Sequence, residues 1–453
     1  MRAESTPAAA CCASIMDDAD LHGSVLQALD HARPDAAVAV LRRLLADHLQ
    51  ASQVHLLLAN YQLTALRPMQ DPDDRAVLTD TPAGEAFVTQ LPVVLSNEAG
   101  ATELYLPVSI RGDRIGVLQL TVPAEPSSHE LDRLGELATV IGYALQAAGG
   151  QTDAMARAAR SQRLTLAAEL QWQLLPGRGC RGPEYQLAGH LEPAYHVHAD
   201  NFDWSQDGDQ LVLSVTDAAR SNQSASLLTT LAVTALRNAR RSGASLADQA
   251  CMADQAVYAH HQGKQYASTL LVRIDLATGR ATAVRAGSPR LFILRGDDVL
   301  MPPLVDQLPL GMFEGTNYVA EHFSLASQDR LLLVSDGIHD AISPTRERFA
   351  DQRLPQLLQA TASLPVGGVV RRVVDELFAH RDLAELDDDA AVICLDWLGR
   401  GTNEPSQSIS RAGNAHPHRA PGTRRLTIVP DGEGGEGDHR AAASVGLDGE
   451  QER

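Results

Sequence analysis

Residues 329–340 read DRLLLVSDGIHD, and the second half of the chain can be interpreted from this stretch. Leu331–Val334 form a short, unbroken apolar run with charged residues on both sides, and an Asp-Gly pair follows. This pattern is typical of a fully buried strand that stops at a turn. We therefore expect Asp336 at the end of a buried strand, although a single Asp-Gly pair is more often only a turn.

The same pattern recurs elsewhere in the chain. Residues 210–217 (QLVLSVTD) form a second apolar run that ends in Asp217, and Asp387–Asp389 come directly before a third run at 390–395. Asp200 lies in a fourth stretch, HADNFDW. Because these carboxylates recur at strand ends, we expect them to converge. Such a cluster repels itself unless cations hold it together.

The carboxylates of Asp200, Asp217, Asp336 and Asp388 suit hard divalent cations, Mn²⁺ or Mg²⁺. Two such ions about 3.5–4 Å apart can activate a bridging water and stabilise the attacking and leaving oxygens of a phosphoryl group. The sequence contains no GxSxG or Walker motif. The chemistry that fits is direct hydrolysis of a phosphate monoester with two metal ions.

Composition limits the class of protein. With 453 residues, the chain is expected to form two domains with extensions. The net charge of −19 argues against a nucleic-acid partner. Five cysteines without a CxxC pair fit a reducing cytoplasm. No apolar run approaches the roughly 20 residues that span a bilayer, so no membrane contact is expected.

Shifts in pattern and composition divide the chain into segments. We expect a disordered leader at 1–35, a sensor-type domain at 36–148, a linker helix within 150–177, a second domain at 178–398 and a disordered tail at 399–453. The tail is predicted because its composition is rich in Gly, Ser, Arg, Asn and Glu and lacks apolar periodicity.

The first domain is predicted to be a compact α+β unit. Residues 36–49 have helical periodicity, and 54–58 form a strand-like run. Two further strand-like runs in 103–122 flank Arg111-Gly112-Asp113, which indicates a hairpin, and Ser127–Glu130 offer a capping box for the next helix. This region resembles a GAF domain in its LPVSIRGDRIGVLQL hairpin and ELDRLGELATVIGYAL helix. The resemblance implies a small-ligand pocket or a dimer surface, and a purely structural role stays open.

Residues 152–175 carry apolar residues at helical spacing and end at Pro176-Gly177. A helix between two domains needs cover for its apolar face. Two arrangements are open: the helix pairs with its copy in a homodimer, or it packs on its own second domain.

The second domain is predicted to be an α/β sandwich. Residues 269–285 form a second hairpin pattern, and 227–240 and 366–379 are amphipathic. Hairpins interspersed with long helices favour two stacked antiparallel sheets flanked by helices.

Residues 170–397 resemble the SpoIIE/RsbU branch of the metal-dependent type-2C (PPM) serine/threonine phosphatases. The motifs that carry the resemblance are LQWQLLP at 170–176, HADNFD at 198–203, VTDAARSN at 215–222, AGS at 286–288, PLG at 309–311, SDG at 335–337 and the Asp388-Asp389 pair. They follow one another in the order and at the spacing of that family.

The resemblance implies that Asp200, Asp217, Asp336 and Asp388 bind metal, with the carbonyl of Ala218 as an extra ligand. It also implies that Asp203, Gly337 and Asp389 orient waters or neighbouring groups. The implied substrate is phosphoserine or phosphothreonine on a STAS-domain anti-anti-sigma protein. The GAF domain would gate this reaction through the linker helix.

Three motifs depart from the family pattern. His198-Ala199 replace two glycines, Arg220-Ser221-Asn222 replace Gly-His-Gly, and Ser288 stands in place of a histidine. Arg220 could contact the phosphate, but a solvated surface arginine is the more common case. His196, His198 and His339 are expected to be rim or packing residues, because imidazole is a poor ligand for Mg²⁺.

Three functions follow from these observations. The first is an active, sensor-gated phosphatase, since every expected carboxylate is present. The second is a pseudophosphatase that binds a partner without turnover, since the glycine loops are altered. The third is a ligand-sensing dimer with a structural second domain.

Overall fold

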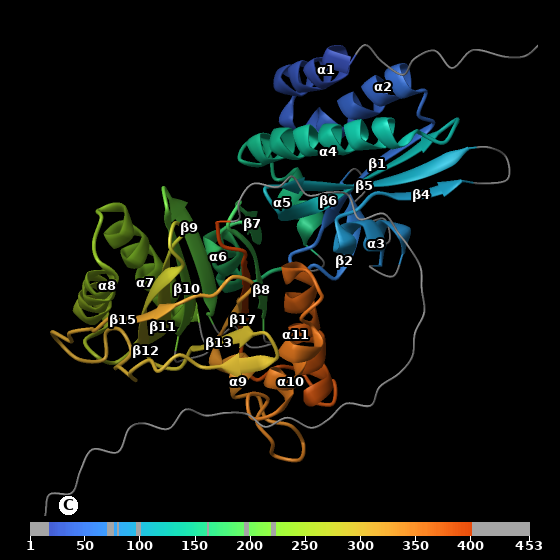
Figure 1. The fold of residues 1–453 in the computed structure, drawn as a ribbon. Helices are drawn as coiled ribbons and strands as arrows, with labels where there is room; N and C mark the ends of the chain where they lie inside the picture. The colour runs from blue at the N-terminus through green and yellow to red at the C-terminus, as the bar shows by residue number, and fades with distance from the viewer. Residues whose placement is uncertain are drawn as a thin grey trace, which may run out of the picture.

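The structure is a computed structural model, and it describes residues 18–69, 77–78, 81–96, 101–160, 163–193, 199–218 and 223–400. Figure 1 shows an N-terminal domain beside a larger C-terminal domain, with helix α11 of the second domain next to the first. The expected fold class, α+β with antiparallel sheets, is confirmed. Among the described residues, no helix combines the length and the apolar character that a bilayer crossing requires.

The N-terminal domain is built on one antiparallel sheet with the strand order β3-β2-β1-β6-β5-β4. Its elements are α1 (Asp18–His31), η1 (Pro34–Ala36), α2 (Ala37–Leu49), β1 (Gln53–Ala59), β2 (Ala65–Pro68), β3 (Val77–Leu78), α3 (Pro82–Thr89), β4 (Val93–Ser96), β5 (Thr102–Ile110), β6 (Asp113–Val122) and α4 (Ser128–Gly149). One apolar core lies between the sheet and α1, α2 and α4, and a smaller one lies between its other face and α3.

The predicted hairpin in 103–122 is present as β5 and β6. Arg111 (φ 50°) and Gly112 (φ 94°) both have positive φ values, as a tight two-residue hairpin turn requires. The capping box is present too, because Ser127 and Glu130 each bind the other's backbone N–H. These local signals therefore predicted the geometry correctly.

The predicted leader at 1–35 is wrong for its second half, because α1 begins at Asp18. Leu21 and Val25 are buried in the core with α2 and α4, and Leu29 packs against it. This spacing places all three side chains on one helical face. The helix is stable because it covers the sheet-facing helices, a tertiary contact that composition does not predict. Residues 1–17 lie outside the described part of the chain.

Replacing Leu21 by alanine is expected to lower the free energy of unfolding of the N-terminal domain by about 2–4 kcal/mol, because it leaves a cavity in this core. Chemical denaturation of the full chain measures the effect. Leu26→Ala on the same helix is the matched control, since Leu26 is 53% exposed. Its expected change is within about 0.5 kcal/mol. Equal effects of the two substitutions would mean that α1 is not packed.

The second domain contains two stacked antiparallel sheets, ordered β15-β12-β11-β10-β9 and β14-β13-β16-β17-β8-β7. The strands are β7 (Gly179–Arg181), β8 (Tyr185–Glu192), β9 (Asn201–Asp207), β10 (Gln210–Ala218), β11 (Ala267–Asp275), β12 (Arg280–Ala286), β13 (Arg290–Arg295), β14 (Asp298–Leu300), β15 (Glu321–Ser324), β16 (Arg330–Val334) and β17 (Ala390–Trp397). The predicted hairpin at 269–285 is β11–β12.

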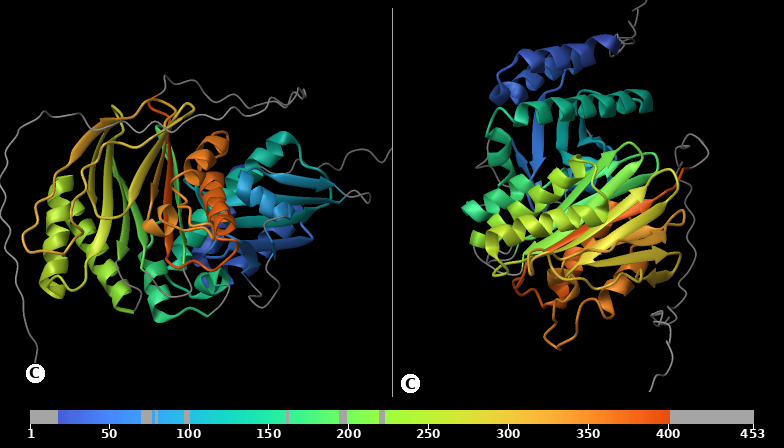
Figure 2. Two further views of the ribbon diagram at one scale, coloured as in Figure 1. Left: turned by 90° about the horizontal axis from the view of Figure 1, so that it is seen from below. Right: turned by 90° about the vertical axis from the view of Figure 1, so that its left-hand side faces the viewer.

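Helices cover both outer faces of the stacked sheets. They are α7 (Gln223–Arg241), α8 (Leu246–His261), α9 (Asp336–His339), α10 (Arg353–Ala360) and α11 (Val366–His380). The central core contains side chains from both sheets, and separate cores lie under α7–α8 and under α10–α11. Figure 2 shows these layers, with α11 between the sandwich and the N-terminal domain. The predicted sandwich is confirmed.

The single helix expected at 152–175 is wrong. The chain forms two short helices, α5 (Ala154–Ala159) and α6 (Leu166–Leu174), and Arg160 between them is extended. Ala158 packs in the core of the N-terminal domain, whereas α6 packs on its own second domain beside α7. Because each half finds cover on a different domain, the chain bends between them. The homodimer stays a prediction.

Candidate active site

The site begins where β16 ends. Ser335 and Ala391 exchange hydrogen bonds, since the Ser335 N–H donates to the Ala391 carbonyl (3.0 Å) and the Ala391 N–H donates to the Ser335 hydroxyl (2.9 Å). Asp336 then opens the one-turn helix α9. The pairing of β16 with β17 therefore holds Asp336 beside the Asp388-Asp389 segment that precedes β17.

Gly337 permits this close approach. A Cβ at position 337 would lie 2.9 Å from the carbonyl carbon of Asp389 and still closer to its oxygen. Any side chain here would collide with backbone, which cannot move aside cheaply. Gly337 therefore lets α9 touch the Asp388-Asp389 segment, and its predicted role in orienting groups at the site stays a prediction.

The second sheet supplies the other two carboxylates. Asp200 immediately precedes β9, and Asp217 lies near the end of the neighbouring strand β10, where Asn201 pairs with Thr216. Burial and then the charge of Asp217, followed by those of Asp389, Asp388 and Asp336, raise the pKa of Asp200 well above its usual range. All five carboxyl groups therefore gather at one place between the two sheets.

Burial and neighbouring carboxylates also act on Asp217 and Asp336. Burial, followed by the charge of Asp336 and that of Asp388, raises the pKa of Asp217 well above its usual range. Burial and the charge of Asp388 also raise the pKa of Asp336. Other carboxylates and burial act most strongly on these groups, and no arginine or lysine is among the strong influences. Among the strongest influences from the described residues, these carboxyl groups thus have no arginine or lysine as a counter-charge.

The donor set fits a hard divalent cation. Both carboxylate oxygens of Asp200 and Oδ1 of Asp336 are buried without a hydrogen-bond partner in the described part of the chain. Buried, unpaired anionic oxygens are costly and are normally paired or bound to metal. Oxygen-only, anionic ligands are what Mn²⁺ and Mg²⁺ prefer.

The carboxyl groups of Asp217 and Asp336 lie close enough for each to influence the pKa of the other. Within the described ranges, no three acidic, histidine or cysteine side chains already have the spacing of a metal site.

Two polar residues contact the cluster. Both lie in the sequence motifs, but the sequence predicted no contact between them and the carboxylates. The Gln171 amide of α6 donates to Oδ2 of Asp389 (2.5 Å) and to the Asp200 carbonyl (3.0 Å). The Ser288 hydroxyl donates to Oδ2 of Asp217 (2.9 Å). The position of Gln171 in the LQWQLLP motif was the available signal, but only the fold brings it to Asp389.

Asp203 does not join the cluster. Its carboxylate binds the guanidinium groups of Arg237 (2.8 Å) and Arg240 (3.0 Å) on α7, and Arg237 also donates to the Leu174 carbonyl (2.7 Å). Asp203 was predicted to orient waters or neighbouring groups; it contacts the neighbouring arginines, and a role toward waters stays a prediction. Its ion pairs anchor the end of α6, because β9 directs this side chain toward α7.

The remaining predicted positions divide into two groups. His339 is buried and bonds the Ser288 carbonyl through Nε2 (2.9 Å), so it is a packing residue as predicted. Ala218 ends β10 and is buried. Arg220, His196 and His198 lie outside the described residues. Ligation by the Ala218 carbonyl and a phosphate contact of Arg220 stay predictions.

Two stacked antiparallel sheets, outer helices and a carboxylate cluster between the sheets give this domain a PP2C-like (PPM) fold. Within this domain, residues 207–398 match the family model described as "Stage II sporulation protein E (SpoIIE)". This part of the chain is therefore similar to the SpoIIE family over less than half of the chain's length.

Two curated proteins are similar over about 30% of this chain. Protein IcfG of Synechocystis sp. is 26% identical over 136 residues, and phosphoserine phosphatase RsbP of Bacillus subtilis is 27% identical over 137 residues. The matched segments span only 21% and 32% of those proteins.

Solved structures with a similar fold include the SiaA-PP2C domain of Pseudomonas aeruginosa. It is 20% identical, with a TM-score of 0.45, and the match covers 51% of this chain and 94% of that one. The RsbU and RsbW domains of a Mycobacterium tuberculosis protein are 22% identical, with a TM-score of 0.42 and coverage of 48% and 62%.

Proposed function

We propose that this protein is a Mn²⁺- or Mg²⁺-dependent phosphatase that removes phosphate from phosphoserine or phosphothreonine on a regulatory protein. The observation that carries the proposal is the gathering of Asp200, Asp217, Asp336 and Asp388 in one buried cluster with no basic partner among the groups that act most strongly on it. Carboxylates so arranged cost free energy unless cations bind them.

The four carboxylates would hold two ions, which supply an activated water and charge stabilisation for phosphoryl transfer. The chain itself supplies the positioning. Gln171 fixes the rotamer of Asp389, and the Ser288 hydroxyl fixes that of Asp217. Ligand orientation by such outer contacts is a large part of metal affinity.

The substrate in this proposal is a phosphorylated STAS-domain anti-anti-sigma protein. Support comes from the resemblance of residues 170–397 to the SpoIIE/RsbU branch and from the match to the SpoIIE family model. In this role the protein would control a sigma factor through its partner.

We also propose that the N-terminal domain is a GAF domain that gates the site through α6. Tyr61 of that domain stacks on Trp172 of α6, with ring centroids 4.8 Å apart. One residue earlier, Gln171 binds Asp389 of the cluster. A shift of α6 would therefore change the geometry of the cluster, which makes α6 a suitable two-state element.

Gln171→Leu is expected to lower turnover about 10- to 100-fold and to raise the Mn²⁺ concentration needed for half-maximal activity, because it frees the Asp389 carboxylate. Gln173→Leu is the matched control, since Gln173 is exposed on the same helix and donates to Glu169 rather than to the cluster. A Mn²⁺ titration of activity compares them. The same half-maximal concentration in both variants would exclude this role of Gln171.

The function is tested by incubating the full chain with a phosphoserine peptide and measuring released phosphate with Mn²⁺, Mg²⁺ or EDTA. Turnover with either cation and none in EDTA is expected. A metal-independent reaction would contradict the proposed role of the carboxylate cluster.

The pseudophosphatase alternative is favoured by the altered motifs. His198-Ala199 and Arg220-Ser221-Asn222 stand where the family has glycine-containing sequences, and Ser288 stands in place of a histidine. A pseudophosphatase would bind a phosphorylated STAS-domain protein without releasing phosphate at any Mn²⁺ concentration. Equilibrium binding measured beside phosphate release separates the two functions.

A further inference from the structure

A second site with unusual charge lies where the two domains meet. A cavity of about 320 Å³ is lined by the β5–β6 hairpin, the segment before β8 and the start of α11. Its basic lining residues are Arg111, Arg114, Arg178 and Arg181. Among the described residues that line it, none is acidic. This is notable in a chain with 57 acidic and 38 basic residues.

Of the four guanidinium groups, that of Arg178 is held by contacts within the described part of the chain. Arg178 donates to the carbonyls of Asn60 and Tyr61 (3.1 Å each) and interacts with Asp113. Arg111, Arg114 and Arg181 have no ion pair within the part of the chain that the structure describes. Three positive charges therefore face one cavity without a counter-ion from the protein.

Arg114 is the most constrained of the three. It is half-buried, and its guanidinium lies against Gly367 in the first turn of α11. A Cβ at position 367 would be 2.7 Å from Nη1 of Arg114 and still closer to Cζ. Burial lowers the pKa of Arg114, and no carboxylate offsets the effect.

The start of α11 adds positive potential at the same place. Pro365 is its N-cap residue, no side chain caps the helix, and its first turn contains no acidic residue. A helix N-terminus carries partial positive charge, and a guanidinium beside it is unfavourable unless an anion lies nearby.

A second cavity of about 400 Å³ adjoins the first and shares Leu63, Arg114, Gly367 and Val370 with it. Its further lining includes the apolar side chains of Phe87, Val88, Val374 and Phe378. Its two carboxylates have partners that line the same cavity: Glu192 bonds His190 and Gln62, and Asp375 lies near Arg371.

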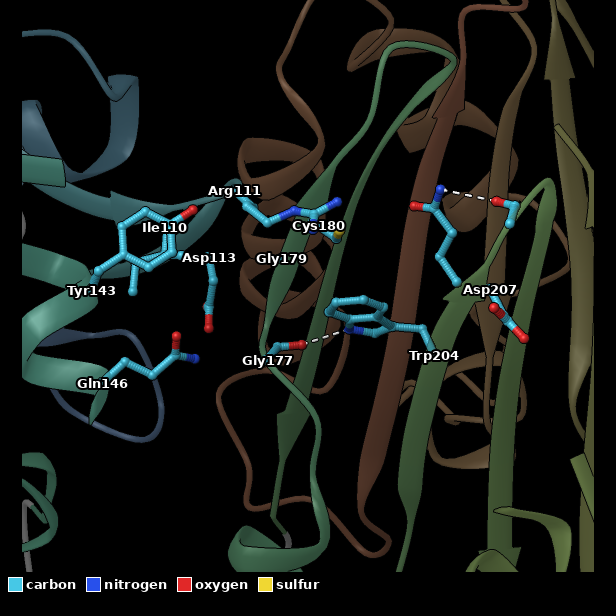
Figure 3. Close-up of a pocket in the computed structure, with 12 residues that line it drawn as sticks. Ile110, Arg111, Asp113, Tyr143, Gln146, Gly177, Gly179, Cys180, Trp204 and Asp207 are labelled. Atoms are coloured by element: carbon cyan, nitrogen blue, oxygen red, sulfur yellow. Dashed lines mark hydrogen bonds between the residues drawn. The ribbon is translucent and has the colours of Figure 1, made fainter. Parts of the chain in front are cut away.

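The cavity on the other side of the hairpin differs in charge. Figure 3 shows it, with Arg111 and Asp113 of the first domain facing Gly177, Trp204 and Asp207 of the second. Two carboxylates and one guanidinium line it, so it is not a selective anion site.

We propose that the interdomain cavity binds a phosphate-bearing small molecule whose remainder is apolar or aromatic. The phosphate would lie between Arg114, Arg181 and the first turn of α11, because guanidinium groups bind phosphate oxygens in a bidentate manner. The apolar remainder would extend into the adjoining cavity. The two volumes together match ordinary small-molecule sites.

Such a ligand would contact both domains at once. Arg111 and Arg114 come from the hairpin of the first domain, whereas Arg181 and Gly367 belong to the second. A ligand that binds only the docked arrangement stabilises it by mass action. This inference concerns binding alone and does not depend on phosphatase activity.

The test is calorimetric titration of the full, metal-free chain in EDTA with phenyl phosphate, and with inorganic phosphate as a second probe. EDTA removes the divalent cations, so the carboxylate cluster can neither turn the probe over nor hold it through a metal ion. We expect saturable binding of phenyl phosphate, weaker binding of inorganic phosphate and a rise in the unfolding temperature with phenyl phosphate.

Arg114→Gln is expected to weaken binding about 10- to 100-fold, the loss of one charge-assisted contact. Arg181→Gln is expected to weaken binding too. Because the Arg181 side chain is exposed, this substitution should not disturb folding, so weaker binding would report the lost contact. Arg43→Gln, on the exposed face of α2, is the matched control and should bind like the unmodified chain. Asp336→Ala should also retain binding.

Three results would overturn the proposal. The first is no binding of phenyl phosphate to the unmodified chain. The second is equal affinity in the Arg181→Gln and Arg43→Gln variants. The third is loss of binding in Asp336→Ala, which would place the probe at the carboxylate cluster.

Discussion

Replacing Asp336 by alanine is expected to lower Mn²⁺-dependent phosphate release by about 1,000-fold or more. Asp336 lies close to Asp217 and Asp388, so its carboxylate would contact the ions that the cluster holds. Loss of such a ligand removes several kcal/mol of charge stabilisation in the transition state. Initial rates with a phosphoserine peptide over a range of Mn²⁺ concentrations measure the effect.

A stability measurement separates this loss from unfolding. In EDTA, Asp336→Ala should unfold at the same temperature as the unmodified chain or higher, because one uncompensated buried carboxyl group is removed. Asp351→Ala is the control, since Asp351 is exposed and its backbone N–H donates to the Arg348 carbonyl rather than to a residue of the cluster. Undiminished turnover in Asp336→Ala would disprove the proposed site.

Replacing Gly337 by alanine is expected to lower turnover about 100-fold and the free energy of unfolding by about 1–3 kcal/mol. The added Cβ would collide with the backbone of Asp389, so α9 and the Asp388-Asp389 segment must separate. A displacement of about 1 Å at a reacting centre can cost this much activity, and overpacking costs this much stability. Both quantities are measured on the same preparation.

The control is Gly135→Ala on α4, where a Cβ would have no neighbour within 4 Å. This variant is expected to keep its activity and to gain about 0.5–1 kcal/mol, because alanine restricts the unfolded chain more than glycine does. If Gly337→Ala behaved like this control, α9 and the Asp389 backbone would not be in contact.

Local pattern was sufficient to predict the hairpins, the capping box and the strand that ends at Asp336. Each depends on residues a few positions apart, such as Arg111 with Gly112 or Ser127 with Glu130. The grouping of Asp200, Asp217, Asp336 and Asp388 could also be anticipated. Carboxylates at strand ends come together once the strands pair, and repulsion between them identifies the cluster as a binding site.

The errors share one physical cause. Helix α1 was missed because its stability comes from packing on α2 and α4, and the linker was predicted as one helix because its periodicity continues across the bend at Arg160. Periodicity indicates which apolar side chains will be buried, but not which surface they pack against.

Contacts between distant segments depend on how the elements pack. Gln171 meets Asp389 across 218 positions of the chain, Asp203 turns to Arg237 on α7, and Arg114 reaches the start of α11. The residue types alone were compatible with several partners for each. The stacking of the two sheets and the docking of the N-terminal domain selected one, because only a packed interior forces each buried charge toward a particular neighbour.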